Sequence, residues 1–227
     1  RTLIGYGPES MYVAYNPYYP PELAHYEARN ASPDRSHNET FDALVTTGVL
    51  GFIVYMFLFG SIFYHGLRWL GLMSTPTQKR LFLGLSLAGA AAGVLLTYLW
   101  DGSLRYMGVG LPLGFILGLG LYVGISTIAS MFGSATEPPA GDRLAGWSLL
   151  LLTALLGSVT AHFIEIHLGI AIAATRTYFW AISALIVLVG QRLVSPEPAP
   201  AALAAGQASP VRAGAKRGEQ RAKGKKR

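Results

Sequence analysis

The chain alternates between long apolar runs and short polar segments. A helix needs ~20 mostly apolar residues to cross the hydrocarbon core of a bilayer. Five runs are long enough and contain few charged side chains: 41–64, 81–99, 107–131, 147–164 and 170–194. The pattern therefore predicts an all-α polytopic membrane protein with about five transmembrane helices. Glycines recur every four or five residues in the second and third runs, as they do where membrane helices pack closely: Gly84, Gly89, Gly93, Gly110, Gly114 and Gly118.

Two polar regions flank these runs. Residues 1–40 are rich in tyrosine and proline, a composition that excludes one continuous helix but supplies too much aromatic area for a disordered segment. We expect an ordered, loop-rich segment at the membrane surface. Residues 195–227 are rich in Ala, Pro and Gly and then in Lys and Arg, and we expect a disordered basic tail after a transmembrane bundle over residues 41–194. Because the sequence starts at Arg1, we interpret it as the C-terminal part of a longer protein.

Charge predicts the orientation of the chain. The net charge is +6, and the tail from Arg192 onward holds nine of the eighteen basic residues but only two of the twelve acidic ones. Cytoplasmic loops are enriched in Lys and Arg, so the tail and the loop containing Arg68, Lys79 and Arg80 are expected in the cytoplasm. Residues 1–40 then face outward. The tail should attract anionic lipids. It has no aromatic side chain to stack on bases, so we expect no nucleic-acid partner.

The polar stretch before the first apolar run is the main candidate for chemistry. Ser36 and Glu39 have the spacing of a capping box, which predicts a helix with His37 at its first position and Asn38 at its second. The N-terminus of a helix can bind an anion such as phosphate. Its dipole disfavours imidazolium, so we expect a neutral, proton-accepting His37. The simpler alternative is that His37 is only a polar start of a membrane helix.

Two motifs carry a resemblance to a known family. His37-Asn38 is followed by nine residues, Gly48, two residues and Gly51, and upstream lies the turn Gly5-Tyr6-Gly7-Pro8. Together they resemble the bacterial O-antigen ligase and polymerase superfamily. The resemblance rests on motifs over residues 1–64 and only on hydropathy beyond them. It implies a GT-C-type glycosyltransferase of the inner membrane, needing neither metal nor cofactor, with the His37 loop in the periplasm. Such an enzyme moves a glycan from undecaprenyl diphosphate to a glycan or lipid acceptor.

The resemblance also implies roles for individual residues. His37 matches the essential histidine of the family, and a nearby upstream arginine, here Arg35 or Arg29, is expected to hold the diphosphate. Asn38 is expected to orient the loop or the imidazole. A local ion pair with Asp34 is the simpler alternative for Arg35. The remaining motif residues are expected to support the site: Ser36, Glu39, Gly48 and Gly51.

A second polar cluster lies around the turn between the fourth and fifth runs. His162 and Glu165 are three residues apart, hence on one helix face. Arg176 lies more than a turn inside the fifth run, where ionisable residues usually face protein or a water-filled cavity. We expect Arg176 to pair with Glu165, and His162, Glu165 and Arg176 to line a cavity. A metal site with His167 is the alternative, but the resembling family needs no metal.

The sequence thus predicts a glycosyltransferase of the O-antigen ligase type in which His37 accepts the proton of the acceptor hydroxyl. An O-antigen polymerase or a protein O-oligosaccharyltransferase of the same superfamily would share all of the visible chemistry. A non-catalytic membrane transporter is the rival from another class. Transporters more often place ionisable residues in the middle of their spans, and here the middle of the first four spans is almost free of charge.

Overall fold

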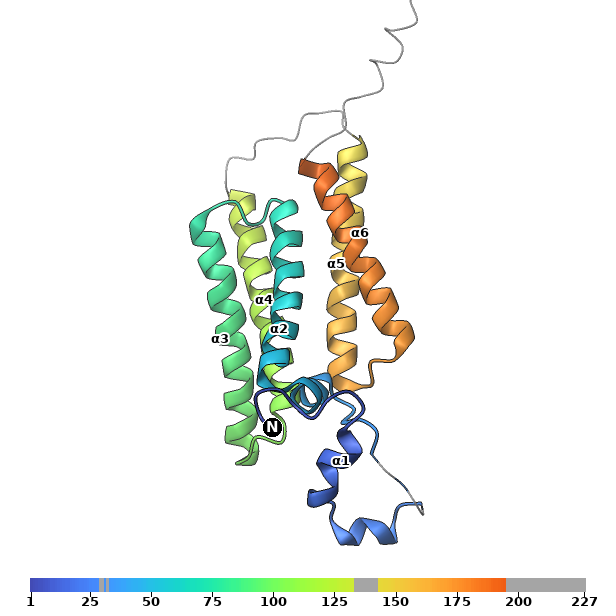
Figure 1. Cartoon of the computed structure of the whole chain (residues 1–227). Coiled ribbons are helices and arrows are strands. Elements are labelled where there is room, and N and C mark those ends of the chain that lie inside the picture. The colour runs from blue at the N-terminus through green and yellow to red at the C-terminus, as the bar shows by residue number, and fades with distance from the viewer. Residues whose placement is uncertain (29–30, 32, 133–142, 195–227) are drawn as a thin grey trace, which may run out of the picture. The chain divides into compact units, whose positions relative to one another are not determined.

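The computed structural model describes residues 1–28, 31, 33–132 and 143–194 (Figure 1), and these residues form helices and connecting turns without a strand. Three short helices come first: α1 (Met11–Tyr15), η1 (Asn16–Tyr18) and η2 (Pro21–His25). Five long helices follow: α2 (Glu39–Trp69), α3 (Pro76–Asp101), α4 (Met107–Phe132), α5 (Arg143–Leu168) and α6 (Ala173–Val194).

All five long helices are long and apolar enough to cross a membrane. Each predicted apolar run lies in one of them, although α6 begins only at Ala173. The prediction of an all-α, multi-pass membrane protein is therefore confirmed. The predicted tail over residues 195–227 lies outside the described residues, as does Arg29.

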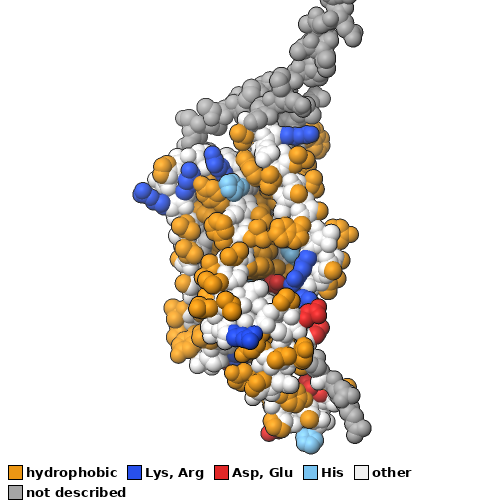
Figure 2. Space-filling model, in the orientation of Figure 1, with side chains coloured by type: hydrophobic (Ala, Val, Ile, Leu, Met, Phe, Trp, Pro, Cys, Tyr) orange, Lys and Arg blue, Asp and Glu red, His pale blue; other side chains and the backbone are white. Residues whose placement is uncertain are grey.

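An aromatic cluster joins four of the long helices. The Phe59 ring of α2 lies 4.7 Å from that of Phe163 on α5 and 4.9 Å from that of Phe179 on α6, between centroids. Phe115 of α4 lies 5.7 Å from Phe163. Such pairs add about 0.5–1.5 kcal/mol each beyond the burial of their area. Outside this core, Figure 2 shows hydrophobic side chains spread over the visible sides of the helices, as expected for surfaces that face lipid.

Helices α3 and α4 pack backbone to backbone through the predicted glycines. A Cβ atom on Gly93 would lie 1.9 Å from the carbonyl oxygen of Gly110, and one on Gly89 would lie 2.3 Å from that of Gly114. Gly118 is equally close to the backbone of Leu85. The predicted close packing is confirmed at these positions. It does not extend to Gly84, which has open space around it.

Helix α2 is broken at Gly48, and the first seven residues of the chain repair the break. Gly48 has φ 68° and ψ −170°, which removes the regular helical bonds of Val49 and Leu50. Their N–H groups instead donate to the carbonyls of Thr2 at 2.9 Å and Leu3 at 3.2 Å. The carbonyls left free one turn earlier accept from this same segment: Tyr6 N donates to Val45 O at 2.8 Å and Gly7 N to Thr46 O at 2.9 Å.

This insertion requires glycine on both sides. A Cβ atom on Gly48 would lie 2.4 Å from the carbonyl carbon of Leu3, and one on Gly5 would lie 2.5 Å from that of Thr46. The backbone of Gly48 is also in a region that is essentially restricted to glycine. The two motifs that carry the family resemblance therefore touch each other, and they fix the first nine residues of α2 against the N-terminal segment.

We predict that Gly48→Ala destabilises the protein by about 1–3 kcal/mol, through backbone strain and the clash with Leu3. Gly60→Ala is the matched control, because Gly60 lies in the same helix with open space around it. Thermal unfolding of both purified variants in detergent, with limited proteolysis of the N-terminal segment, tests this. Equal melting temperatures for the two variants would contradict it.

Candidate functional site

The start of α2 differs from the sequence prediction. Asn38 is the N-cap, with extended φ and ψ of −155° and 116°, and its Oδ1 accepts from Phe41 N at 3.3 Å. The helix thus begins at Glu39, and the prediction that Ser36 caps a helix with His37 and Asn38 in its first turn is wrong. Ser36 instead directs both its N–H and its hydroxyl to Oδ1 of Asp42, at 2.7 Å each. Asparagine and serine cap helices about equally well, so tertiary contacts decide between them.

The contacts that decide are made by the buried amide of Asn38. Its Nδ2 donates to Gly108 O of α4 at 2.8 Å and to His167 O of α5 at 2.6 Å. Both carbonyls lack a helical partner: Pro112 has no N–H to give Gly108, and His167 lies in the last turn of α5. Gly108 also makes room, since a Cβ there would lie 2.5 Å from Asn38 Oδ1. One carboxamide therefore ties the ends of three helices together.

Glu39, next in the chain, pairs with Arg176 at the start of α6. Nη2 of Arg176 lies 3.1 and 3.3 Å from the two carboxylate oxygens. Two predictions are therefore wrong. Glu39 does not form a capping box with Ser36, and Arg176 does not pair with Glu165. Glu165 instead contacts His162 Nδ1 at 3.2 Å. The Glu39 side chain is 11% exposed and that of Arg176 is 48% exposed, so the pair faces an open space on one side.

That space is a cavity of about 440 Å³ at the end of the bundle where Asn38 lies. It is lined by residues of the N-terminal segment, of α2, where Tyr55 is one of them, and of α6. Its charged lining residues are Glu9, Asp34, Arg35, Glu39, Asp42 and Arg176. Two guanidinium groups and four carboxyl groups thus share one cavity. Arg176 was predicted to line a cavity, whereas His162 and Glu165 are not among the described residues that line this one.

The Tyr/Pro-rich segment is fixed at the cavity by both of its ends. Pro8 and Glu9 at its start and Asp34 and Arg35 at its end all line the cavity. In between, the Tyr19 hydroxyl donates to Glu27 Oε2 at 2.7 Å. This hydrogen bond raises the pKa of Tyr19 above its usual value.

Arg35 and His37 are two residues apart but lie in different surroundings. Arg35 lines the cavity, and its Nη1 donates to the carbonyl of Ala171 at 3.3 Å rather than pairing with Asp34. His37 is exposed and has φ 55°, a left-handed conformation that is uncommon for a residue with a side chain. It lies between Arg35 and Glu39 in the chain, but within the described part of the protein it does not line the cavity.

Sequence reasoning missed the two other titratable lining residues of α2, Asp42 and Tyr55. Asp42 is a carboxylate inside an otherwise apolar run, and this was a signal that it needs a polar partner at the membrane boundary. Tyr55 gave no such signal, because tyrosine is common near membrane surfaces. Glycines 48 and 51 act through the backbone: Gly48 breaks the helix, and Gly51 leaves room for the side chain of Thr47.

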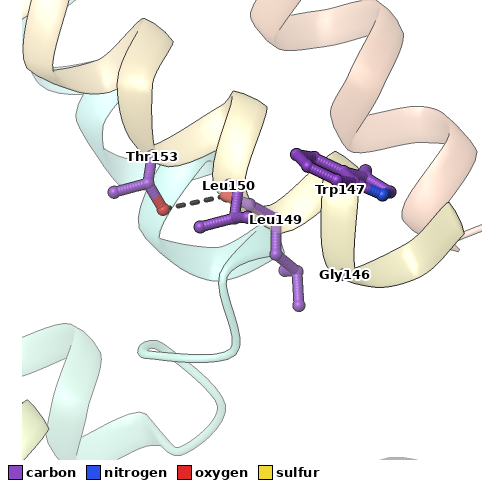
Figure 3. Close-up of a pocket in the computed structure, with 5 residues that line it drawn as sticks. All are labelled: Gly146, Trp147, Leu149, Leu150 and Thr153. Atoms are coloured by element: carbon purple, nitrogen blue, oxygen red, sulfur yellow. Dashed lines mark hydrogen bonds between the residues drawn. The ribbon is translucent and has the colours of Figure 1, made fainter. Parts of the chain in front are cut away.

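A second hollow, of about 470 Å³, lies near the start of α5 (Figure 3). Gly146, Trp147, Leu149, Leu150 and Thr153 line it, and the hydroxyl of Thr153 donates to the carbonyl of Leu149 at 2.9 Å. These lining residues include no ionisable group. We therefore take the charged cavity at the Asn38 end as the candidate site.

The candidate site combines two guanidinium groups with carboxylates and a nearby exposed imidazole. Guanidinium groups bind phosphate oxygens, and imidazole or carboxylate can accept a proton.

No family model matches the chain, and neither a curated protein nor a solved structure matches it significantly.

We predict that Asn38→Asp destabilises the protein at least as much as Asn38→Ala. Aspartate retains the capping oxygen, but its second oxygen would face the carbonyls of Gly108 and His167 without a proton to donate. Each unbonded buried carbonyl costs about 1–3 kcal/mol. Melting temperatures of the purified variants test this, with the exposed Asn16→Asp as the control. A melting temperature of Asn38→Asp above that of Asn38→Ala would contradict it.

Proposed function

We propose that this chain is a membrane glycosyltransferase of the O-antigen ligase type. In this proposal it transfers a glycan from undecaprenyl diphosphate to a glycan or lipid acceptor. The observation that carries the proposal is one cavity that places Arg35 and Arg176 together beside the His37-Asn38 motif. The contact between the Gly5 turn and Gly48 supports it as well, because these are the two motifs shared with the family.

The charges of the cavity define how a diphosphate would bind. Glu39 already holds Arg176, and the hydroxyl and N–H of Ser36 already satisfy one oxygen of Asp42. A diphosphate would therefore bind on the side of the cavity that Arg35 and the exposed face of Arg176 provide. It would share Arg176 with Glu39, whose carboxylate keeps the guanidinium in place before the donor arrives. Such placement of charge in advance is what lowers the barrier when the leaving group departs.

The proposed orientation follows the distribution of basic residues. Arg68, Lys79 and Arg80 lie at the end of α2 and the start of α3, opposite to the Asn38 end, and Figure 2 shows Lys and Arg side chains gathered near the α2–α3 turn. The positive-inside rule then assigns this end to the cytoplasm and the cavity to the periplasmic side of the inner membrane.

The proposed reaction is a single displacement at the anomeric carbon of the donor. The acceptor oxygen forms a bond to this carbon as the bond from the carbon to the diphosphate oxygen breaks, and the electron pair leaves with the diphosphate. His37 takes the proton of the acceptor hydroxyl, a role that contributes typically ~10²–10⁴-fold to the rate. His37 is exposed, whereas the two arginines line the cavity. In this proposal the acceptor therefore reaches His37 from the protein surface, and the diphosphate of the donor occupies the cavity.

We predict that His37→Gly lowers glycan transfer by about 10²–10⁴-fold while leaving the fold intact. Glycine adopts the left-handed conformation of position 37 without strain, so stability should rise by up to about 1–2 kcal/mol. The assay reconstitutes the full-length protein with an undecaprenyl-diphosphate-linked glycan and candidate acceptors. His25→Gly is the matched control, as an exposed histidine of the same segment.

Transfer by His37→Gly at the wild-type rate would remove His37 from the mechanism. Flux of an ion or solute in vesicles that contain no donor lipid, without any glycan transfer, would instead favour a transporter. Product analysis with several acceptors also separates a ligase from a polymerase or a protein-directed transferase.

A further inference from the structure

Two polar atoms beside the cavity have complementary hydrogen-bonding needs that the protein does not meet. The Tyr55 hydroxyl and His167 Nε2 are both buried, and in the described part of the chain neither has a hydrogen-bond partner. His167 as a whole is only 2% exposed. Buried polar atoms are bonded in the great majority of cases, so two such atoms on neighbouring rings require an explanation.

The hydrogen bond on the other side of the imidazole defines the role of Nε2. Nδ1 of His167 lies 2.5 Å from the carbonyl of Phe163, and a carbonyl can only accept. Nδ1 therefore carries the proton, and in the neutral ring Nε2 presents a lone pair. Tyr55, on the facing helix, has a hydroxyl proton to donate. One of the two atoms is thus a free acceptor and the other a free donor.

The Tyr55 hydroxyl and His167 Nε2 belong to neighbouring rings but are not hydrogen-bonded to each other. The rings of Tyr55 and His167 are 6.4 Å apart between centroids and tilted by 59°, and the structure contains no direct hydrogen bond between them. The imidazole is held in place, since its Nδ1 is bonded and its ring lies 4.5 Å from that of Phe163. The backbone carbonyl of His167 is also bound by Asn38. Tyr55 lines the cavity together with Glu39 and Arg176.

We propose that the Tyr55 hydroxyl and His167 Nε2 together form a binding site for one hydroxyl group next to the cavity. This hydroxyl accepts a hydrogen bond from Tyr55 and donates one to His167 Nε2, so a single group satisfies both buried atoms. A neutral hydroxyl fits, whereas an anion has no proton to give to the lone pair of Nε2. The hydroxyl belongs either to a water molecule or to a sugar of the glycan. The sugar alternative rests on the proposed function, whereas the water alternative does not.

The test is solid-state NMR on the full-length protein, labelled with ¹⁵N-histidine and reconstituted in liposomes. The signal of His167 is assigned by its loss in His167→Gln. We expect His167 Nε2 to resonate as a hydrogen-bonded acceptor and to receive magnetisation from water in a water-edited spectrum. Tyr55→Phe should shift this resonance and remove most of the transfer from water. Tyr122→Phe is the matched control, because its hydroxyl donates to the carbonyl of Leu72 at 2.7 Å, away from His167.

An Nε2 resonance typical of an unbonded nitrogen in the wild type would overturn the proposal. So would a bonded resonance without transfer from water or glycan, since this indicates a direct bond to Tyr55. The wild-type spectrum gives this answer even if Tyr55→Phe fails to fold. Addition of the donor glycan, ¹³C-labelled, separates the two sources: transfer from sugar to His167 assigns the hydroxyl to the glycan, and unchanged transfer from water assigns it to water. Because no turnover is measured, the result is independent of whether glycan transfer is detected.

Discussion

The side-chain amide of Asn38 is the contact on which the candidate site depends. Helices leave carbonyls unbonded at their C-termini and opposite an internal proline, and within a membrane such groups find no water. Here the carbonyls of His167 and Gly108 are of these two kinds, and the two N–H groups of Asn38 satisfy both. Because Asn38 is also the N-cap of α2, it fixes where that helix begins relative to α4 and α5. Glu39, the next residue, is thereby directed toward Arg176 of α6.

The second constraint is the break in α2. Four backbone groups released at Gly48 are bonded by the chain's own first seven residues, so the N-terminal segment forms part of the cavity wall rather than a free end. The two non-glycine residues with positive φ in the described part of the chain are Glu9, at 52° in the cavity wall, and His37, at 55° and two residues from Arg35. Such conformations persist only where the surroundings hold them, and they concentrate at functional sites. Glu9 shares the cavity with Arg35 and Arg176, as expected for a preformed binding site.

Hydropathy was sufficient to predict the five long helices, and glycine spacing was sufficient to predict the close packing of α3 and α4. The wrong predictions concern the N-cap of α2 and the partner of Arg176. In both cases more than one residue was possible, and residues far along the chain determine which of them is used. Ser36 and Asn38 can each cap a helix, and only the carbonyls of Gly108 and His167, far along the chain, favour Asn38. Arg176 likewise had two possible carboxylate partners, and the 137-residue separation from Glu39 concealed the real one. The repaired break at Gly48 depends on backbone atoms alone, so side-chain patterns could not indicate it.

The central claim is that the cavity at the Asn38 end receives the diphosphate of a lipid-linked glycan. The most direct measurement is a structure of the full-length protein in nanodiscs with a non-transferable undecaprenyl-diphosphate glycan analogue bound. Our account predicts phosphate oxygens within hydrogen-bonding distance, about 3.5 Å or less, of both Arg35 and Arg176. It also predicts that the sugar lies on the side where His37 can reach the attacking hydroxyl. A diphosphate bound away from both arginines, or at the opposite end of the bundle, would contradict it.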